Sequence, residues 1–271
     1  MKRLINLRPD TEGKFVLGIL PFLLLLIVYY FASDARLAIN PNDKLLPGFS
    51  QFGEAIWRVA FEADKRTGGY LLWDDTWASI LRLGSGILLA ALLGLVVGVL
   101  NGTIPLVKAV FSPILIFISL IPPLAILPIL LILLGLGEIS KVSLIIIGTA
   151  PFIARDLQSK TAEISYEQLV KAQTLGANTA QIIFRVILPQ VLPKLITSVR
   201  LSLGSGWLFL IAAESIAATE GLGYRIFLVR RYMSMDVILP YVLWITLLAF
   251  VIDFVLNAIN RKLFPWQKEG K

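Results

Sequence analysis

The chain has 271 residues, 57% of them hydrophobic, and a mean hydropathy of +0.80. Soluble domains are about 45–50% apolar, so this composition excludes an ordinary soluble protein. The net charge is +7, but the basic residues flank apolar runs, as they do beside membrane spans, which argues against a nucleic-acid partner. The chain has no cysteine and no histidine, so disulfides, thiolate metal sites and histidine-based hydrolase chemistry are not expected.

The first predicted membrane span covers residues 15–32, after a basic cytoplasmic N-terminus at residues 1–14. Its apolar run is long enough to cross a bilayer. A cleaved signal peptide is the alternative, but signal peptides have a shorter apolar region and end in small residues. The polar segment at residues 33–76 is predicted to be extracytoplasmic.

The second predicted span covers residues 79–100. Arg82 falls within one turn of its start, from where the side chain could reach the membrane interface. Gly94, Gly98 and Gly102 recur every four residues and so lie on one helix face. Such a face allows close contact with another helix.

The third apolar stretch, residues 107–135, is too long for one straight span. Pro122 and Pro123 interrupt it, and proline removes a backbone donor and clashes with the preceding turn. A helix break is therefore predicted near Pro122. Irregular backbone at membrane depth is tolerated where it lines a cavity, so the break is either a simple kink or part of the solute pathway.

Three further spans are predicted at residues 141–153 (continuing to 157), 192–213 and 237–256. Six spans place both termini on the same side, and the basic residues in 1–14 and in the tail 259–271 make that side cytoplasmic. Residues 77–258 then form a five-helix core. Three arginines, at positions 225, 230 and 231, fall on the outer side and depart from this charge rule.

A polar segment at residues 158–190 lies between the fourth and fifth spans. Its spacing predicts a short helix, a turn at Gly176, a second short helix, and then Pro189 opening the next span. The segment resembles the "EAA" loop of binding-protein-dependent ABC importers, in which Gly is followed after nine residues by Ile-x-Leu-Pro. Gly176 and residues 186–189 (VILP) match that pattern, whereas Val170 stands where the family has glutamate and Lys171 where it has alanine.

The resemblance extends over nearly the whole chain. Residues 121–125 (IPPLA), 134–138 (LGLGE) and 221–224 (GLGY) resemble the nitrate, sulfonate and taurine permeases. Two further blocks, residues 151–156 and 211–231, resemble the branch described as urea carboxylase-related, which is associated with uptake of guanidine.

This resemblance implies an all-α membrane protein with the MetI-like type I permease fold, working as a homodimer in the inner membrane. Its partners would be two ATPase subunits, which bind ATP and Mg, and an extracytoplasmic solute-binding protein. The chain itself has no G-x-x-x-x-G-K-[ST] phosphate loop, so ATP hydrolysis is expected on the partner. The residues expected to couple ATPase movement to the spans are Lys171, Ala172, Gly176, Leu188 and Pro189.

The expected solute is a small nitrogen compound, with guanidine as the first choice. Paired carboxylates at Glu214 and Glu220 would suit a planar guanidinium ion, and nearby aromatic rings could add cation–π contacts. Two alternatives stay open: the carboxylates pair with Arg225, Arg230 and Arg231, or those arginines attract a small anion such as nitrate, a sulfonate or bicarbonate. The candidate pathway residues are Pro122, Pro123, Trp207, Glu214, Glu220 and Tyr224.

An ATP-independent channel or secondary transporter is the rival from another functional class. Secondary transporters often carry inverted repeats, and none is found in the sequence. A membrane enzyme fits less well still, because no nucleophile–base pair is evident.

Overall fold

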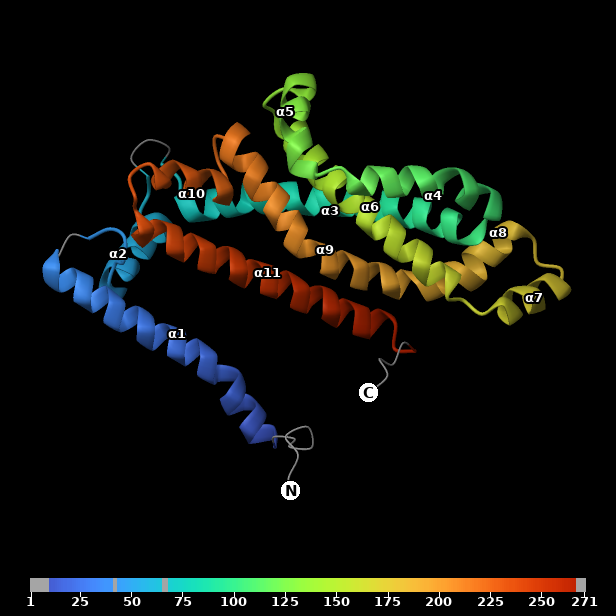
Figure 1. Ribbon diagram of the computed structural model, residues 1–271, viewed down its shortest axis with the longest axis horizontal. Coiled ribbons are helices and arrows are strands. Elements are labelled where there is room, and N and C mark those ends of the chain that lie inside the picture. Colours follow the sequence, from blue (N-terminus) through green and yellow to red (C-terminus); the bar gives the residue numbers. More distant parts are fainter. Residues whose placement is uncertain (1–9, 41–42, 65–67, 267–271) are drawn as a thin grey trace.

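The computed structural model describes residues 10–40, 43–64 and 68–266, and within these ranges it is helical with no strand. The helices in chain order are α1 (Thr11–Ile39), α2 (Phe49–Phe61), α3 (Leu71–Thr103), α4 (Pro105–Leu120), α5 (Pro123–Leu134), α6 (Glu138–Ala162), α7 (Tyr166–Thr174), α8 (Thr179–Gln181), the π-helical turn η2 (Ile182–Ile187), α9 (Leu188–Ala217), α10 (Leu222–Arg230) and α11 (Met235–Leu263). Helices α3 and α11 run along the long axis of the molecule, α6 crosses it obliquely, and α9 bends along its length (Figure 1).

The centre of the bundle is the seam between α3 and α6. The predicted glycine face lies in this seam: a Cβ atom on Gly98 would come within 2.7 Å of the Ala154 carbonyl oxygen, and one on Gly94 within 2.6 Å of the Ile153 side chain. No real Cβ atom tolerates such distances, so the backbones approach this closely only because the residues are glycine. The predicted role of the face is confirmed.

The predicted break of the third apolar stretch is also confirmed. Helices α4 and α5 meet at 92° across Ile121 and Pro122. Pro123 occupies the first turn of α5, where a missing N–H costs nothing, and Pro122 lies just before it. Figure 1 shows α5 projecting from the side of the bundle as a result.

Helix α1 lies apart from the bundle in Figure 1 and contains the whole of the predicted first span. It is joined to α2 by a short connection, where the Tyr29 hydroxyl donates to the Pro47 carbonyl at 2.7 Å and the Ser33 hydroxyl to that of Leu46 at 3.0 Å. The segment at residues 33–76, predicted to be polar and extracytoplasmic, contains helix α2 and the start of α3.

Among the described residues, four helices are long and apolar enough to cross a membrane, and the bent α4–α5 pair makes a fifth candidate. Helix α6 does not meet the same criterion, although it contains the predicted fourth span. Charged side chains at both of its ends lower its hydropathy. The count of six spans stays a prediction.

Two boundaries differ from the sequence prediction. Helix α3 begins at Leu71, eight residues before the predicted start at 79, because the polar residues there are paired inside the protein rather than exposed. Pro189 lies in the first turn of α9, as predicted, but no break separates α9 from the helical turns before it. Thr179–Ala217 is one continuous helix of 39 residues, in which η2 widens the turn so that the Leu188 N–H bonds to Ile183, five residues back, just before the proline.

Candidate functional site

Polar side chains gather at both ends of the bundle. We call the set Arg82, Lys141, Glu138, Glu214 and Glu220 the Arg82 cluster; it lies beside α10, at the end opposite the α7–α8 connection in Figure 1. Because the Arg82 cluster and the α7–α8 connection are separated by most of the length of the bundle, the predicted site residues fall into separate groups.

Glu214 on α9 is completely buried and fully hydrogen-bonded. Its carboxylate accepts hydrogen bonds from Arg82 at 2.9 Å, from the Ser79 hydroxyl at 2.8 Å and from the Gly223 backbone N–H at 2.8 Å. A buried charge is tolerated when paired and hydrogen-bonded in this way. Of the alternatives for Glu214, the structure therefore favours a structural ion pair, but with Arg82 as the partner and not with Arg225.

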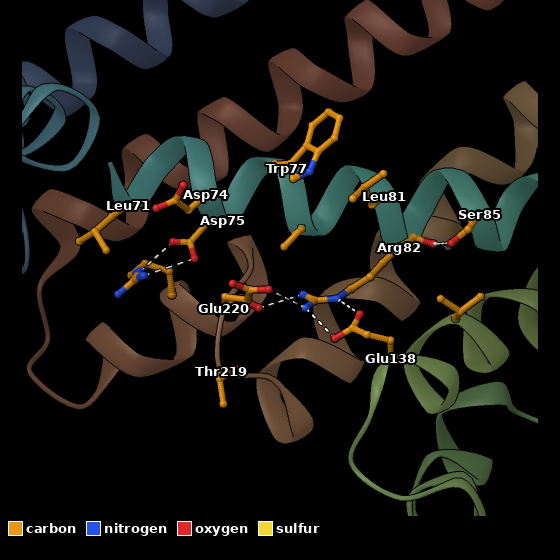
Figure 2. A pocket seen from close by; sticks show the side chains of 13 residues that line it. Leu71, Asp74, Asp75, Trp77, Leu81, Arg82, Ser85, Glu138, Thr219 and Glu220 are labelled. Atoms are coloured by element: carbon orange, nitrogen blue, oxygen red, sulfur yellow. Dashed lines mark hydrogen bonds and ion pairs between the residues drawn. The ribbon is translucent and has the colours of Figure 1, made fainter. Parts of the chain in front are cut away.

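Arg82 does not reach out to the membrane interface, because α3 starts earlier than predicted and Arg82 lies three turns inside it. The side chain is buried and points between Glu138 and Glu220 (Figure 2). Its donors are distributed over Glu138, Glu214 and the Glu220 carbonyl at 2.5–2.9 Å, and the Glu220 carboxylate lies 3.7 Å away. Of the five N–H donors of this guanidinium, four are hydrogen-bonded to the protein itself, so the protein uses this arginine almost completely.

Glu138 opens helix α6 and extends the cluster toward solvent. Hydrogen bonds from Arg82 and then from Lys141 lower the pKa of its carboxyl to about 2. The Glu138 charge is therefore present at every pH that the protein meets in a cell.

A second buried pair adjoins the cluster. Asp75 accepts from Arg225 at 2.8 Å, from the Tyr241 hydroxyl at 3.1 Å and from the Gly221 backbone N–H at 2.9 Å. Gly221 has a φ of +123°, which L-residues rarely adopt. In its turn the Gly221 and Gly223 N–H groups donate to Asp75 and Glu214, and the Leu222 N–H between them donates to the Ser79 hydroxyl. The turn between α9 and α10 is thus fixed by acidic residues from α3 and α9.

A cavity of about 730 Å³ adjoins both pairs, and Glu220 and Glu138 line it. Figure 2 shows its wall on α3, from Leu71 to Ser85. Its charged residues are four carboxylates and two arginines: Asp74, Asp75, Glu138, Glu220, Arg82 and Arg225. Within the described residues no group of three or more acidic side chains is arranged to hold a metal ion.

Two other predicted pathway residues lie apart from this cavity. Trp207 is 5% exposed and buried in the core, and its indole N–H has no acceptor among the described residues. Tyr224 on α10 is half-buried, with the Arg225 guanidinium 5.8 Å from its ring centre.

The α7–α8 connection has the predicted shape. Gly176 ends helix α7 with a φ of +79°. Its N–H bonds to the Gln173 carbonyl at 2.9 Å, and the Ala177 N–H bonds to that of Ala172 at 3.0 Å. This pair of bonds is the Schellman arrangement that glycine permits at a helix end, and Asn178 then caps α8.

The connection presents apolar side chains outward. Leu175 is 88% exposed and Phe184 is 67% exposed. Lys171 is exposed on α7, while Val170, Leu188 and Pro189 are half-buried. Among the predicted coupling residues, Lys171 and Gly176 therefore lie on the exposed surface, whereas Ala172, Leu188 and Pro189 are partly buried beneath it.

A third place of interest adjoins the α4–α5 break. A cavity of about 480 Å³, which we call the break cavity, lies between the break and helix α6. Pro123 lines it, whereas Pro122 is not among its lining residues. Its polar lining residues are Ser119, Arg155, Asp156 and Ser159.

Sequence reasoning missed Asp75, Ser79 and Glu138 and misplaced Arg82. The signal that identifies three of them is their spacing: positions 75, 79 and 82 recur at helical intervals and so share one face of α3. Glu138 gave no local signal, because its partner Arg82 is 56 residues away in sequence.

Comparison with known proteins supports the importer family. Residues 86–268 match the family model described as "Binding-protein-dependent transport system inner membrane component". The chain is 37% identical over 198 residues to the taurine transport system permease protein TauC of Escherichia coli strain K12, covering 73% of this chain and 72% of that protein. It is 30% identical over 196 residues to a putative aliphatic sulfonates transport permease protein of Bacillus subtilis strain 168, covering 72% and 71%.

Among solved structures, the MetNI methionine ABC transporter in an inward-facing conformation gives a TM-score of 0.63 at 24% identity, covering 73% of this chain and 99% of that chain. This likeness shows the MetI-like type I permease fold. The relatives are permease subunits, whose ATPase is a separate chain. The match over most of the chain and the identity to TauC show that this protein belongs to the binding-protein-dependent transport system inner membrane component family, as a permease subunit of an ABC importer.

Proposed function

We propose that this permease moves a small anion of the sulfonate class into the cell. The 37% identity to the taurine permease carries the proposal, and the sulfonate permease of Bacillus subtilis agrees with it. The guanidine branch expected from residues 151–156 and 211–231 gains no support from these relatives.

The Arg82 cluster supports the same choice. The guanidine hypothesis depends on free carboxylates at Glu214 and Glu220, but Glu214 is completely buried and already binds the guanidinium of Arg82. Glu220 is left as a single exposed carboxylate 3.7 Å from that arginine. A free guanidinium ion would have to displace a side chain of the protein that is tethered in place.

In this proposal two copies of the chain form the membrane unit, with both termini cytoplasmic. The exposed surface around Gly176 and Leu175 docks on ATPase subunits that bind ATP and Mg, and a solute-binding protein delivers the anion at the other end. The fixed glycine turn and the continuous helix that follows it support this coupling role, because a rigid contact transmits movement better than a flexible loop.

Uptake by the complete complex in proteoliposomes tests the proposal. The permease, its ATPase and its binding protein are supplied with taurine, an alkanesulfonate, nitrate or guanidine, and both ATP hydrolysis and uptake are measured. We expect sulfonates to stimulate both in the presence of ATP. Stimulation by guanidine alone would overturn the anion assignment, and uptake without ATP would overturn the importer class.

A further inference from the structure

The break cavity is bounded by the one stretch where the third apolar segment loses its helical hydrogen bonding. Ile121 and Pro123 line it, opposite Gly148 and Pro151 on α6. Exposed backbone groups at membrane depth are tolerated where they face a water-filled cavity. A volume of about 480 Å³ lies within the range of small-molecule sites.

The two charged residues that line this cavity, Arg155 and Asp156, form no ion pair with each other within the described residues. Arg155 is exposed and, within the described residues, is in no ion pair. Its neighbour Asp156 instead accepts a hydrogen bond from Ser198 on α9. The guanidinium donors of Arg155 are therefore available to a ligand, in contrast to those of Arg82.

A second cavity of about 340 Å³ continues from the first. Arg155 and Ser159 line both, and the second adds Lys108, Ser112 and Gln158. Lys108 is also exposed, and the described residues offer it no ion pair. The two cavities together extend from the α4–α5 break to the first turn of α4, and the side chains of Arg155 and Lys108 line them.

We infer that Arg155 is the residue of the membrane path that binds the anionic group of the solute, on the α7–α8 side of the break. This inference rests on the proposed function and adds a specific contact to it. The guanidinium matches a sulfonate or carboxylate through two parallel hydrogen bonds. The Ser159 hydroxyl, which also lines the cavity, supplies a further donor, and Lys108 attracts the anion onward.

The absence of cysteine from the chain allows a direct test. Ser159→Cys places a thiol one turn from Arg155 on the same helix face. The complex carrying it is treated in nanodiscs with the anionic 2-sulfonatoethyl methanethiosulfonate or with its trimethylammonium analogue. Adding Arg155→Gln should lower the anionic-to-cationic ratio of labelling rates at least about fivefold, because it removes a charge about 6 Å from the thiol.

The matched control is Arg230→Gln in the same cysteine background. Arg230 is an arginine of α10 that stacks 4.9 Å from the Phe227 ring, outside both cavities. The Arg230→Gln substitution should leave the anionic-to-cationic labelling ratio unchanged. An equal ratio in the Arg155→Gln and Arg230→Gln proteins would overturn the inference.

Nanodisc composition distinguishes solute from lipid. If the sulfonate reagent labels equally fast in phosphatidylcholine and in phosphatidylglycerol, and taurine slows it during turnover, the cavity receives the solute. Slower labelling in phosphatidylglycerol alone would assign Arg155 to a lipid headgroup and overturn the pathway role.

Uptake separates this inference from the proposed function. Arg155→Gln should lower sulfonate uptake at least about tenfold, and Arg155→Lys, which keeps the charge but not the paired donors, should restore part of it. Full uptake by Arg155→Gln would refute the role of Arg155 while leaving the anion importer intact. If the unmodified complex imports no sulfonate, the proposed function itself fails.

Discussion

At the Arg82 cluster, four of the five N–H donors of a buried arginine are hydrogen-bonded to the protein's own carboxylates and to one carbonyl group. At the break cavity, Arg155 faces an open space and has no ion-pair partner within the described residues. Both arginines come from long helices of the same bundle. The difference lies in hydrogen-bond occupancy: the guanidinium of Arg82 is held by the protein's own acceptors, whereas that of Arg155 is left available, as the proposed pathway role requires.

The largest expected effect is on the Arg82 cluster. Arg82→Met leaves the Glu214 carboxylate buried without its cation, and breaking a buried pair in this way costs about 3–5 kcal/mol. We expect a loss of that size in the free energy of unfolding, measured by denaturant titration in detergent. The control is Glu220→Gln, which changes an exposed partner and should cost less than about 1 kcal/mol. Equal effects of the two substitutions would contradict the structural role assigned to Arg82.

The next effect concerns Gly176, at the other end of the bundle. Gly176→Val puts a β-branched residue at a φ of +79°, which costs L-residues about 1–2 kcal/mol or more. We expect ATP hydrolysis to continue with uptake lowered several-fold, because the contact surface changes shape. The control Gly84→Ala adds a Cβ in open space on α3. Normal coupling in Gly176→Val would show that the glycine turn is not needed.

A smaller effect is expected on the pH dependence of stability, through Glu138 in the Arg82 cluster. The folded-state pKa of Glu138 is about 2, below its ordinary value of 4.5. Its ionised form therefore stabilises the fold above pH 4.5, and this contribution is lost as the pH falls toward 2. The unfolding midpoints of the unmodified protein and of Glu138→Gln should differ from pH 5 to 8 and converge as the pH falls. A constant difference at all pH values would contradict the assignment.

The smallest expected effect is the stability change on removing the free arginine. Arg155→Gln should alter the free energy of unfolding by less than about 0.5 kcal/mol, as exposed substitutions usually do. The same denaturant titration used for Arg82→Met measures it. A loss comparable with that of Arg82→Met would show that Arg155 is a structural residue, and the contrast between the two regions would disappear.

Local features of the fold were predictable from the sequence. Pro122 removes a backbone donor wherever it lies, so the helix break needed no tertiary information. Gly176 followed from its place between two short helical patterns, and the Gly94–Gly98 face followed from four-residue spacing. Pro189 lies in the first turn of α9 as predicted, but no sequence signal indicated the π-helical turn that joins α9 to α8 without a break.

Long-range pairing was not predictable in the same way. Glu214 looked like a solute site, because a lone carboxylate in a span gives no indication of a partner 132 residues earlier. Arg82 looked exposed because the start of α3 was placed too late in the chain. The adjacency of Arg155 and Asp156 in the sequence likewise gives no indication that Asp156 bonds to Ser198 on another helix.

The unbroken helix Thr179–Ala217 has a mechanical consequence. At about 1.5 Å per residue, Glu214 lies about 52 Å along this rod from its first residue. A tilt of about 5° imposed at the Thr179 end would therefore swing the Glu214 end through about 5 Å, if the rod pivots at its base. That displacement exceeds the 2.9 Å hydrogen bond between Glu214 and Arg82. A small movement at the Thr179 end of the helix is therefore enough to break the Glu214–Arg82 ion pair at its other end.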